Sequence, residues 1–350
     1  MGVLRRALAN VALVVFGLVV ALGLCELVAR LTWRPPPPPA PAVARHPEGL
    51  PVLRTLMQLA PRNVRGVLPN GAYYRTNSLG VRGPEYDRPA PPGVFRIVTV
   101  GDSVTMGAGV EEEDTYSTQL GAMLAARHPG RRFEVINGGL AGLDIVQIVG
   151  RLEKVGLPYD PNLIVYGWTM NDITGPAYRE FARPKASYAL YHAVYDRFAG
   201  SRSYLLRVLW PRWISFRELV APHPQSYTAE LRYNYFENPE AWERFTAQLD
   251  RLAAIGREHG ICVVVFIHTS LVRLNGFHPM RSIYERVADA AETRGLHAVQ
   301  SLSALVGRTE DQLRLSYYDW HPNRAGHALL AQALADGIDA LPAECGVAAE

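Results

Sequence analysis

A serine at the end of one β-rich run stands in a setting that suits nucleophilic catalysis. The run 95–100 (FRIVTV) is followed by GDSVT, in which the serine is Ser103. On a turn from a strand into a helix, a serine is exposed and its backbone N–H lies at a helix N-terminus, which favours negative charge. The residue could equally be an ordinary helix N-cap, and these five residues alone leave both interpretations open.

Three further segments stand where other strands or loops should end. Gly139 lies in NGGLAG and Asn171 in NDI, each shortly after an apolar β-rich run. Asp319 and His321 stand in DWHPN, just before the last helical stretch. Because reactive groups collect at the carboxyl ends of parallel strands, we expect these residues to converge with Ser103. A lone Asp-x-His pair is weak evidence, but four segments in this order are much stronger.

Together these residues resemble the SGNH (GDSL-type) hydrolase superfamily, over roughly residues 95–340. Ser103 matches the first family block, Gly139 the second, Asn171 the third, and His321 with Asp319 the fifth. The upstream segment TNSLGVRG (76–83) also looks like segments found in membrane-anchored members.

Three positions depart from the family pattern. Val104 replaces the leucine of the GDSL name. The family often has glycine two residues before the third-block asparagine, whereas Gly167 precedes Asn171 by four. Asp319 precedes His321 by two residues rather than three, a spacing that some members share.

The resemblance implies a serine esterase mechanism. Ser103 would attack an ester carbonyl, His321 would take its proton, and Asp319 would orient the imidazole. The oxyanion would be held by the N–H groups of Ser103 and Gly139 and by the side-chain amide of Asn171.

Other chemistries find less support. Asp102 and Asp172 flank the motif residues and are interpreted as structural caps. His327 follows His321 by six residues, but no third ligand stands at a spacing that suits zinc, so no metal is expected. No phosphate-binding Gly–Lys–Ser/Thr motif or complete dinucleotide fingerprint is present, so no cofactor is expected. A net charge of +3 gives no case for a nucleic-acid partner.

Alternating strands and helices must position these residues. With 48% hydrophobic and 20% charged residues, the chain is not a disordered one. The strand pattern occurs at 95–100, 133–136, 163–166, 261–267 and 297–300, and the helical pattern at about 115–127, 240–259, 279–294 and 323–338. Strands this apolar are buried on both faces, which predicts an α/β fold with a doubly wound parallel sheet of about five strands. The resemblance implies a three-layer α/β/α, flavodoxin-like arrangement.

A long insertion, 173–237, separates the third strand from the fourth. It is rich in arginine and aromatic residues, among them Tyr188, Tyr191, Tyr195, Trp210, Trp213, Tyr233 and Tyr235. Long loops in compact domains are usually functional. The aromatic residues could form a small core of their own or a lid over a substrate groove, and the two interpretations are compatible.

The N-terminus is almost continuously apolar from Ala7 to Leu31 and is followed by Trp33 and five prolines, 35–39. About 20 apolar residues span a bilayer, so we expect a membrane anchor with a stiff stalk. A buried core helix and a cleaved signal peptide are the alternatives. The flanking arginines do not decide the orientation, but a short tail before a long domain usually exports that domain.

The expected organisation follows. Residues 1–6 form a short cytoplasmic tail, 7–33 a transmembrane signal anchor, 34–94 a Pro-rich stalk and lead-in, 95–342 the hydrolase domain and 343–350 a tail. The catalytic domain would then be extracytoplasmic, either periplasmic or at the cell surface. Three cysteines, Cys25, Cys262 and Cys345, cannot make a disulfide framework. Unpaired thiols are expected, with a Cys262–Cys345 bridge as the alternative.

The leading functional hypothesis is a membrane-anchored esterase that removes acyl groups from a glycan or lipid. An acyltransferase that passes the acyl group to a sugar hydroxyl would use the same triad. A third hypothesis is an inactive, anchored carbohydrate-binding module, against which the complete set of motif residues argues.

Overall fold

The computed structural model describes residues 2–32, 49–51, 53, 62–68, 70–174, 201–209, 213, 227–274, 278–316 and 319–347. The chain forms two compact units. One comprises Met1–Pro35 with Phe181–Glu230, and the other Pro36–Glu180 with Leu231–Glu350. The second unit contains all five residues of the predicted site.

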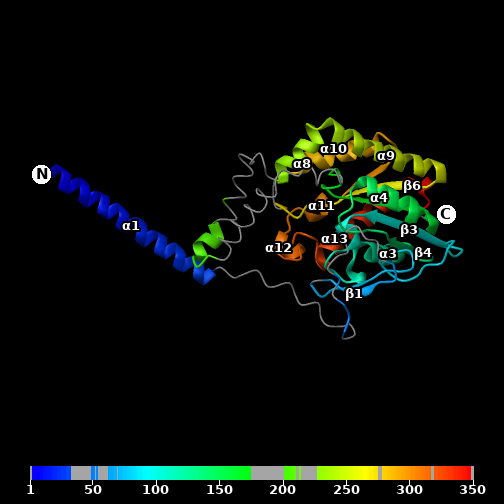
Figure 1. Ribbon diagram of the computed structural model, residues 1–350, viewed down its shortest axis with the longest axis horizontal. Coiled ribbons are helices and arrows are strands. Elements are labelled where there is room, and N and C mark those ends of the chain that lie inside the picture. The colour runs from blue at the N-terminus through cyan, green and yellow to red at the C-terminus, as the bar shows by residue number, and fades with distance from the viewer. Residues whose placement is uncertain are drawn as a thin grey trace. The chain divides into compact units, whose positions relative to one another are not determined.

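A five-stranded parallel sheet forms the centre of the second unit (Figure 1). Its strands are β3 (Val94–Gly101), β4 (Arg132–Asn137), β5 (Leu163–Trp168), β6 (Cys262–Ile267) and β7 (His297–Gln300). They lie in the order β4-β3-β5-β6-β7, and every neighbouring pair is parallel. This is the flavodoxin-like order, so the predicted fold class is confirmed. The strand order reverses between β3 and β5, where such sheets bind ligands.

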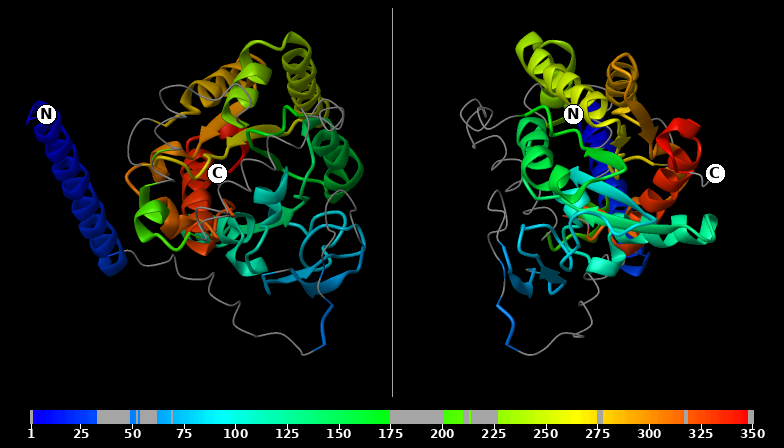
Figure 2. Two further views of the ribbon diagram at one scale, coloured as in Figure 1. Left: turned by 60° about the vertical axis from the view of Figure 1, so that its left-hand side comes forward. Right: turned by 90° about the vertical axis from the view of Figure 1, so that its right-hand side faces the viewer.

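Helices cover both faces of the sheet (Figures 1 and 2). The helices α3 (Tyr116–Arg127) and α13 (Arg324–Asp339) share one apolar core with Ile97 of β3. Val98, the next residue, points to the other core, because successive side chains of a strand alternate between its faces. That second core contains residues of α4 (Ile145–Arg151), α8 (Tyr227–Phe236), α9 (Pro239–His259) and α10 (Arg281–Glu292).

Short helices connect these elements. They are α2 (Ser103–Met106), η1 (Glu112–Asp114), η2 (Leu152–Gly156), η3 (Leu157–Tyr159), α11 (Leu302–Leu305), α12 (Glu310–Leu313) and η4 (Ala343–Cys345). The sequence pattern did not indicate α4, which begins at a capping box. The Asp144 side chain accepts from the Gln147 backbone N–H, and the Gln147 side chain accepts from that of Asp144.

The lead-in packs on the second unit through a small hairpin. Strands β1 (Arg65–Val67) and β2 (Tyr73–Arg75) pair antiparallel. Arg82 then forms an isolated bridge to Asn137 at the end of β4. Tyr74 and Arg82 are each only 1% exposed, so this part of the lead-in belongs to the folded core rather than to a stalk. Trp33 and the five prolines lie outside the described residues.

A disulfide joins Cys262 and Cys345, so the expectation of unpaired thiols was wrong. Cys262 begins β6, and η4 returns the chain after α13 to the same place, with a Cα–Cα distance of 5.4 Å. A sequence separation of 83 hides this approach. His297 Nε2 lies 3.6 Å from the Cys345 sulfur, but sulfurs joined in a disulfide are not thiolate ligands for a metal. Cys25 is free and exposed.

In the first unit, α1 (Gly2–Thr32) is a single long helix with exposed apolar side chains. Within the described part of the chain it is the one helix long and apolar enough to cross a membrane, over Arg5–Thr32. A signal sequence meets the same criterion.

The Glu26 side chain connects α1 to a helical segment at 204–209 in the same unit. Its carboxylate accepts from the Ser203 hydroxyl at 2.7 Å and from the backbone N–H groups of Tyr204 and Leu205, each at 2.9 Å. Arg30 pairs with Glu26 at 2.8 Å and lies over the Tyr204 ring. Glu26 therefore caps the N-terminus of that segment.

Most of the insertion 173–237 lies outside the described residues, including Tyr188, Tyr191, Tyr195 and Trp210. At its C-terminal end, Leu231 and Tyr235 of α8 are fully buried in the second unit. The Tyr235 hydroxyl donates to the carbonyl oxygen of Met170 at 3.2 Å, one residue before Asn171. These two side chains belong to the main core of the second unit.

Candidate active site

The turn from β3 into α2 places Ser103 at the first position of a helix. A Cβ atom on Gly101 would lie 2.1 Å from Thr105 Oγ1 and 2.5 Å from the Gly167 carbonyl oxygen, so only glycine permits this approach. Asp102 is the N-cap, because its Oδ1 accepts from the Val104 N–H at 3.0 Å. The N–H of Ser103 has no intrahelical acceptor at this position. It is available to bind an anion.

His321 connects Ser103 to Asp319. His321 Nε2 lies 2.8 Å from Ser103 Oγ, and His321 Nδ1 lies 2.6 Å from Asp319 Oδ1. Because the carboxylate accepts, the ring proton is on Nδ1, and Nε2 is free to accept the serine proton. The backbone N–H of His321 also donates to Asp319 Oδ1, at 3.1 Å. The spacing of two residues therefore allows the pair to meet.

The loop before α13 holds these two side chains. Leu315 N–H donates to the carbonyl oxygen of His321 at 2.9 Å, and Asp319 N–H donates to Ser316 Oγ at 3.0 Å. Asn323 caps α13 by accepting from the Gly326 N–H at 3.1 Å. The side chains of His321 and Asp319 remain 35% and 49% exposed, so solvent reaches the base.

The electrostatics suit a general base paired with a carboxylate. Burial lowers the pKa of His321, but the hydrogen bond and charge of Asp319 and the charge of Asp102 outweigh it. The pKa of His321 consequently lies above its ordinary value. Burial raises the pKa of Asp319, whereas its bond to His321 lowers it, and the net direction is downward. Each partner thus favours the charged form of the other.

Asn171 lies beside Ser103, as predicted. Its Nδ2 donates to Asp102 Oδ2 at 3.3 Å, and Ser103 Oγ lies 3.4 Å from the same oxygen. The absence of a glycine two residues before Asn171 therefore does not prevent the approach. Thr169 occupies that position, and its hydroxyl lies 3.0 Å from Asn171 Oδ1.

Gly139 lies behind the serine helix, and its N–H already has a partner. That N–H donates to Asn137 Oδ1 at 3.0 Å, while Asn137 Nδ2 donates to the Thr105 carbonyl oxygen at 2.8 Å. A Cβ atom on Gly139 would lie 2.3 Å from the Met106 nitrogen. The geometry explains the need for glycine by close backbone packing, and it does not support the expected donation to an oxyanion.

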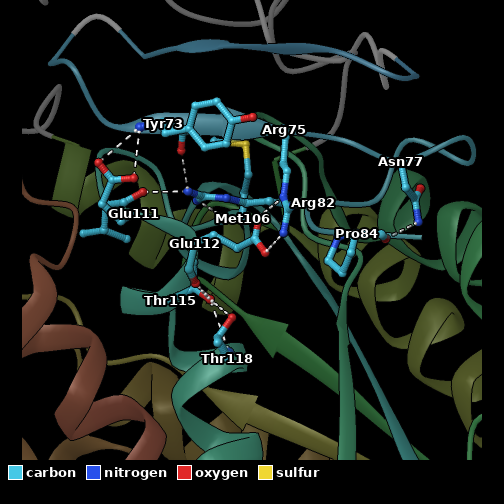
Figure 3. Close-up of polar contacts among 11 residues, drawn as sticks. Tyr73, Arg75, Asn77, Arg82, Pro84, Met106, Glu111, Glu112, Thr115 and Thr118 are labelled. Carbon is cyan, nitrogen blue, oxygen red and sulfur yellow. Dashed lines mark hydrogen bonds and ion pairs between the residues drawn. The ribbon is translucent and has the colours of Figure 1, made fainter. Parts of the chain in front are cut away.

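Two lead-in residues that the sequence analysis overlooked contact the serine helix and the short helix η1 that follows it (Figure 3). Arg82, from the lead-in, donates to the carbonyl oxygens of Met106 at 2.8 Å and of Gly107 at 2.7 Å, at the C-terminal end of α2. Arg75 pairs with Glu112 at 2.7 Å in the loop that follows. The resemblance of TNSLGVRG to anchored family members marked this segment, but not its contact with the serine helix.

His327, the residue considered above as a zinc ligand, lies in the core. It is fully buried, and its Nδ1 accepts from the Tyr116 N–H at 3.2 Å. Burial, with the neighbouring charges of His268, Arg82 and His321, lowers the pKa of His327 to about 3. It is a neutral core residue.

Several solved structures are similar to a large part of this chain. LAE5, an alpha/beta hydrolase enzyme from the metagenome of Lake Arreo, Spain, is 18% identical, with a TM-score of 0.43, over 71% of this chain and 96% of its own. Axe2, an acetylxylan esterase from Geobacillus stearothermophilus, is 17% identical, with a TM-score of 0.43, over 70% of this chain and 94% of its own. TesA is 16% identical, with a TM-score of 0.42, over 70% and 98%. These likenesses concern the fold alone.

Among curated proteins, none matches the chain. The model of the GDSL-like Lipase/Acylhydrolase family matches residues 99–329, about two thirds of the sequence and all of the motif residues. The chain belongs to this family, and it is an ester-hydrolysing enzyme.

Proposed function

We propose that the protein is a membrane-anchored serine esterase of the extracytoplasmic face, and that its substrate is an acyl ester of a glycan or lipid. The observation that supports the catalytic assignment is the continuous hydrogen-bonded relay from Ser103 Oγ through His321 to Asp319. Ser103 attacks the ester carbonyl as Nε2 of His321 takes its proton, and the imidazolium then protonates the leaving alcohol. Water repeats the sequence on the acyl-enzyme.

The oxyanion is held by the N–H of Ser103 and by Nδ2 of Asn171. Asn171 Nδ2 and Ser103 Oγ both lie within 3.4 Å of Asp102 Oδ2, after strands β5 and β3, which flank the switch point. Loss of one such donor typically costs about 10²–10³ in turnover. The N–H of Gly139 joins them only if it leaves Asn137 Oδ1. Hydrolysis is favoured over transfer to a sugar because the side chains of His321 and Asp319 are open to water.

A fluorophosphonate probe and the variant Ser103→Ala test the nucleophile. The probe should label the wild-type chain and not the variant, and the variant should lose at least about 10³ in ester turnover. Ser282→Ala, an exposed serine on α10, is the matched control and should behave as wild type. If Ser103→Ala kept more than about a tenth of the turnover, the assigned nucleophile would be wrong. Product analysis with and without a sugar acceptor separates hydrolysis from acyl transfer.

Two observations support the location. The exposed apolar side chains of α1 suit a signal anchor over 7–33, after a cytoplasmic tail of 1–6. The Cys262–Cys345 disulfide suits an oxidising compartment outside the cytoplasm. In this arrangement, the hydrolase domain over 95–342 is completed by the buried part of the lead-in within 34–94 and by Cys345 of the segment 343–350.

Fractionation tests the anchor. The full chain should sediment with membranes and resist carbonate extraction, and a shortened chain beginning at Ala40 should be soluble. A C-terminal reporter should be active only if it works outside the cytoplasm. Recovery of a mature form that starts between residues 22 and 40 would show cleavage and rule out the anchor.

A further inference from the structure

The Thr169 hydroxyl lies among three oxygen atoms directly beside the proposed oxyanion site. Its Oγ1 is 2.9 Å from Asp102 Oδ2, 2.9 Å from Asp172 Oδ1 and 3.0 Å from Asn171 Oδ1. Thr169, Asp102 and Asp172 are 7%, 2% and 1% exposed. Water therefore has little access to this cluster, and its hydrogen bonds must be satisfied internally.

A proton count constrains the cluster. A hydroxyl carries one proton, and neither a carboxylate nor an amide oxygen carries any. If both aspartates were ionised, Thr169 could donate to only one of them at a time. The other carboxylate oxygen would face Oγ1 at 2.9 Å with no proton between, which is costly in a buried site. One of the two aspartates must supply a second proton.

Asp102 accepts hydrogen bonds from several donors. It is the N-cap of α2, and its carboxylate accepts from the N–H of Val104 and from Nδ2 of Asn171. Carboxylates at helix N-termini are stabilised by the helix dipole. On the solvent side of Ser103, His321 becomes an imidazolium during the reaction and favours the charge of Asp102 further.

Asp172 is suited to carry the proton. Its Oδ2 accepts from the Tyr166 hydroxyl at 2.6 Å and from the Thr169 N–H at 3.2 Å. Among the residues that the structure describes, the partner of its Oδ1 is the Thr169 hydroxyl. The neighbouring cation, Arg244 of α9, donates to the carbonyl oxygen of Ile173. Burial and the charge of Asp102 raise the pKa of Asp172 well above its ordinary value, although its bonds to Tyr166 and Thr169 lower it. The Tyr235 hydroxyl, near Tyr166, is bonded to Met170.

We propose that a neutral Asp172 and Thr169 form a positioning pair for the oxyanion site. Asp172 Oδ1–H donates to Thr169 Oγ1, and the Thr169 hydroxyl donates to Asp102 Oδ2, shared with Asn171 Oδ1. This arrangement holds the Asn171 amide at both ends, since its Nδ2 is on Asp102. A neutral Asp172 also adds no negative charge to oppose the oxyanion. The inference rests on the proposed role of Asn171, and the threonine replaces the glycine that the family often has.

Substitutions at Thr169 test the positioning role. Thr169→Val keeps the shape and removes the hydroxyl, so kcat should fall about tenfold or more while KM changes little. Thr169→Ser restores the hydroxyl and should restore most of the kcat. An asparagine at position 172 offers a donor group and an acceptor group, as a neutral aspartic acid does, whereas a leucine offers neither. Asp172→Asn should therefore retain far more kcat than Asp172→Leu. Equal kcat values for Thr169→Val and wild type would overturn the positioning role.

The protonation state has a test that does not depend on catalysis. If folded Asp172 is neutral, folding takes up a proton at any pH between the ordinary aspartate pKa of about 4 and the raised pKa of the folded state. The wild-type chain should then lose stability relative to Asp172→Asn as pH rises through this range. Below about pH 4 the stability difference between the two chains should no longer change with pH. A wild-type chain that gains stability over Asp172→Asn with rising pH would show an ionised Asp172. Thermal unfolding gives this answer even if Ser103 is not the nucleophile.

Discussion

Arg82 donates a hydrogen bond of 2.8 Å to the carbonyl oxygen of Met106, the last residue of the helix that begins with Ser103. The same guanidinium donates to the carbonyl oxygens of Gly107, Tyr73 and Val110. It is a buried cation placed at the negative end of the serine helix, with four carbonyl groups in place of a carboxylate partner. The lead-in thus fixes the C-terminal end of α2, the helix that begins with Ser103.

Replacement of Arg82 should destabilise the fold and the serine helix together. Arg82→Met leaves four buried carbonyl oxygens without this donor, at about 1–3 kcal/mol for each that stays unsatisfied. Arg82→Lys keeps the charge but not the fork of donors, and should lie between Met and wild type. Denaturant unfolding measures the effect. Arg65→Met, at an exposed position of β1, is the control and should change stability little. Equal stability of the Met variants at 82 and 65 would contradict the role of Arg82.

The acid limb of the pH–rate profile should report His321. The base must be neutral, so kcat/KM rises with pH through the pKa of His321 in the free enzyme. Because that pKa is raised, the limb should lie above the ordinary imidazole value of about 6.5. Asp319→Asn removes the charge that raises it, so the limb should move to lower pH while turnover falls by up to about 10⁴. An acid limb that stays in place in Asp319→Asn would assign it to another group.

Glu26 should control the exposure of the segment that it caps. Glu26→Ala removes the acceptor for Ser203, Tyr204 and Leu205. Trypsin should then cleave the full-length protein faster after Arg202 and Arg207. Glu26→Gln keeps one acceptor oxygen and should give an intermediate rate. Glu285→Ala, an exposed position of α10, controls for a change of charge. Identical cleavage rates in all these chains would show that the contact is not maintained.

Reduction of the Cys262–Cys345 disulfide should lower stability substantially. The bond closes a loop over a sequence separation of 83, for which chain entropy gives about 4–5 kcal/mol. The double variant Cys262→Ala, Cys345→Ala should lower the free energy of unfolding by a comparable amount. Cys25→Ala, at the exposed free thiol, should not. Unfolding that is insensitive to reductant would mean that the bond is absent in the isolated protein.

The sequence predicts those elements of the fold that depend on a local residue pattern. All five strands and the helices α3, α9, α10 and α13 were expected within about two residues, because apolar runs and helical periodicity record burial directly. The motif order likewise located Ser103, Asn171, Asp319 and His321. Contacts between residues that are distant in sequence produce no such local pattern. The sequence alone does not distinguish Arg82 from the other arginines, because its role depends on the contact between the lead-in and α2.

Gly139 and Thr169 show the same limit within the motifs. A motif identifies a glycine but not the acceptor of its N–H, which Asn137 supplies. Thr169 stood out only as a missing glycine, and its role follows from two aspartates that meet around its hydroxyl. The disulfide was missed because a turn after α13 reverses the chain.

The disulfide also separates the proposed catalytic residues into two groups, one inside and one outside a closed loop. Asp319 and His321 lie inside the loop closed by Cys262 and Cys345, and Ser103 and Asn171 lie outside it. After a peptide-bond break anywhere within that loop, Asp319 and His321 remain covalently attached at Cys262, the first residue of β6. β6 pairs with β5, the strand that leads to Asn171. The tether keeps the effective concentration of the severed part high, so it can dock again rather than diffuse away. The fold would thereby tolerate a backbone break within this loop better than it would without the disulfide.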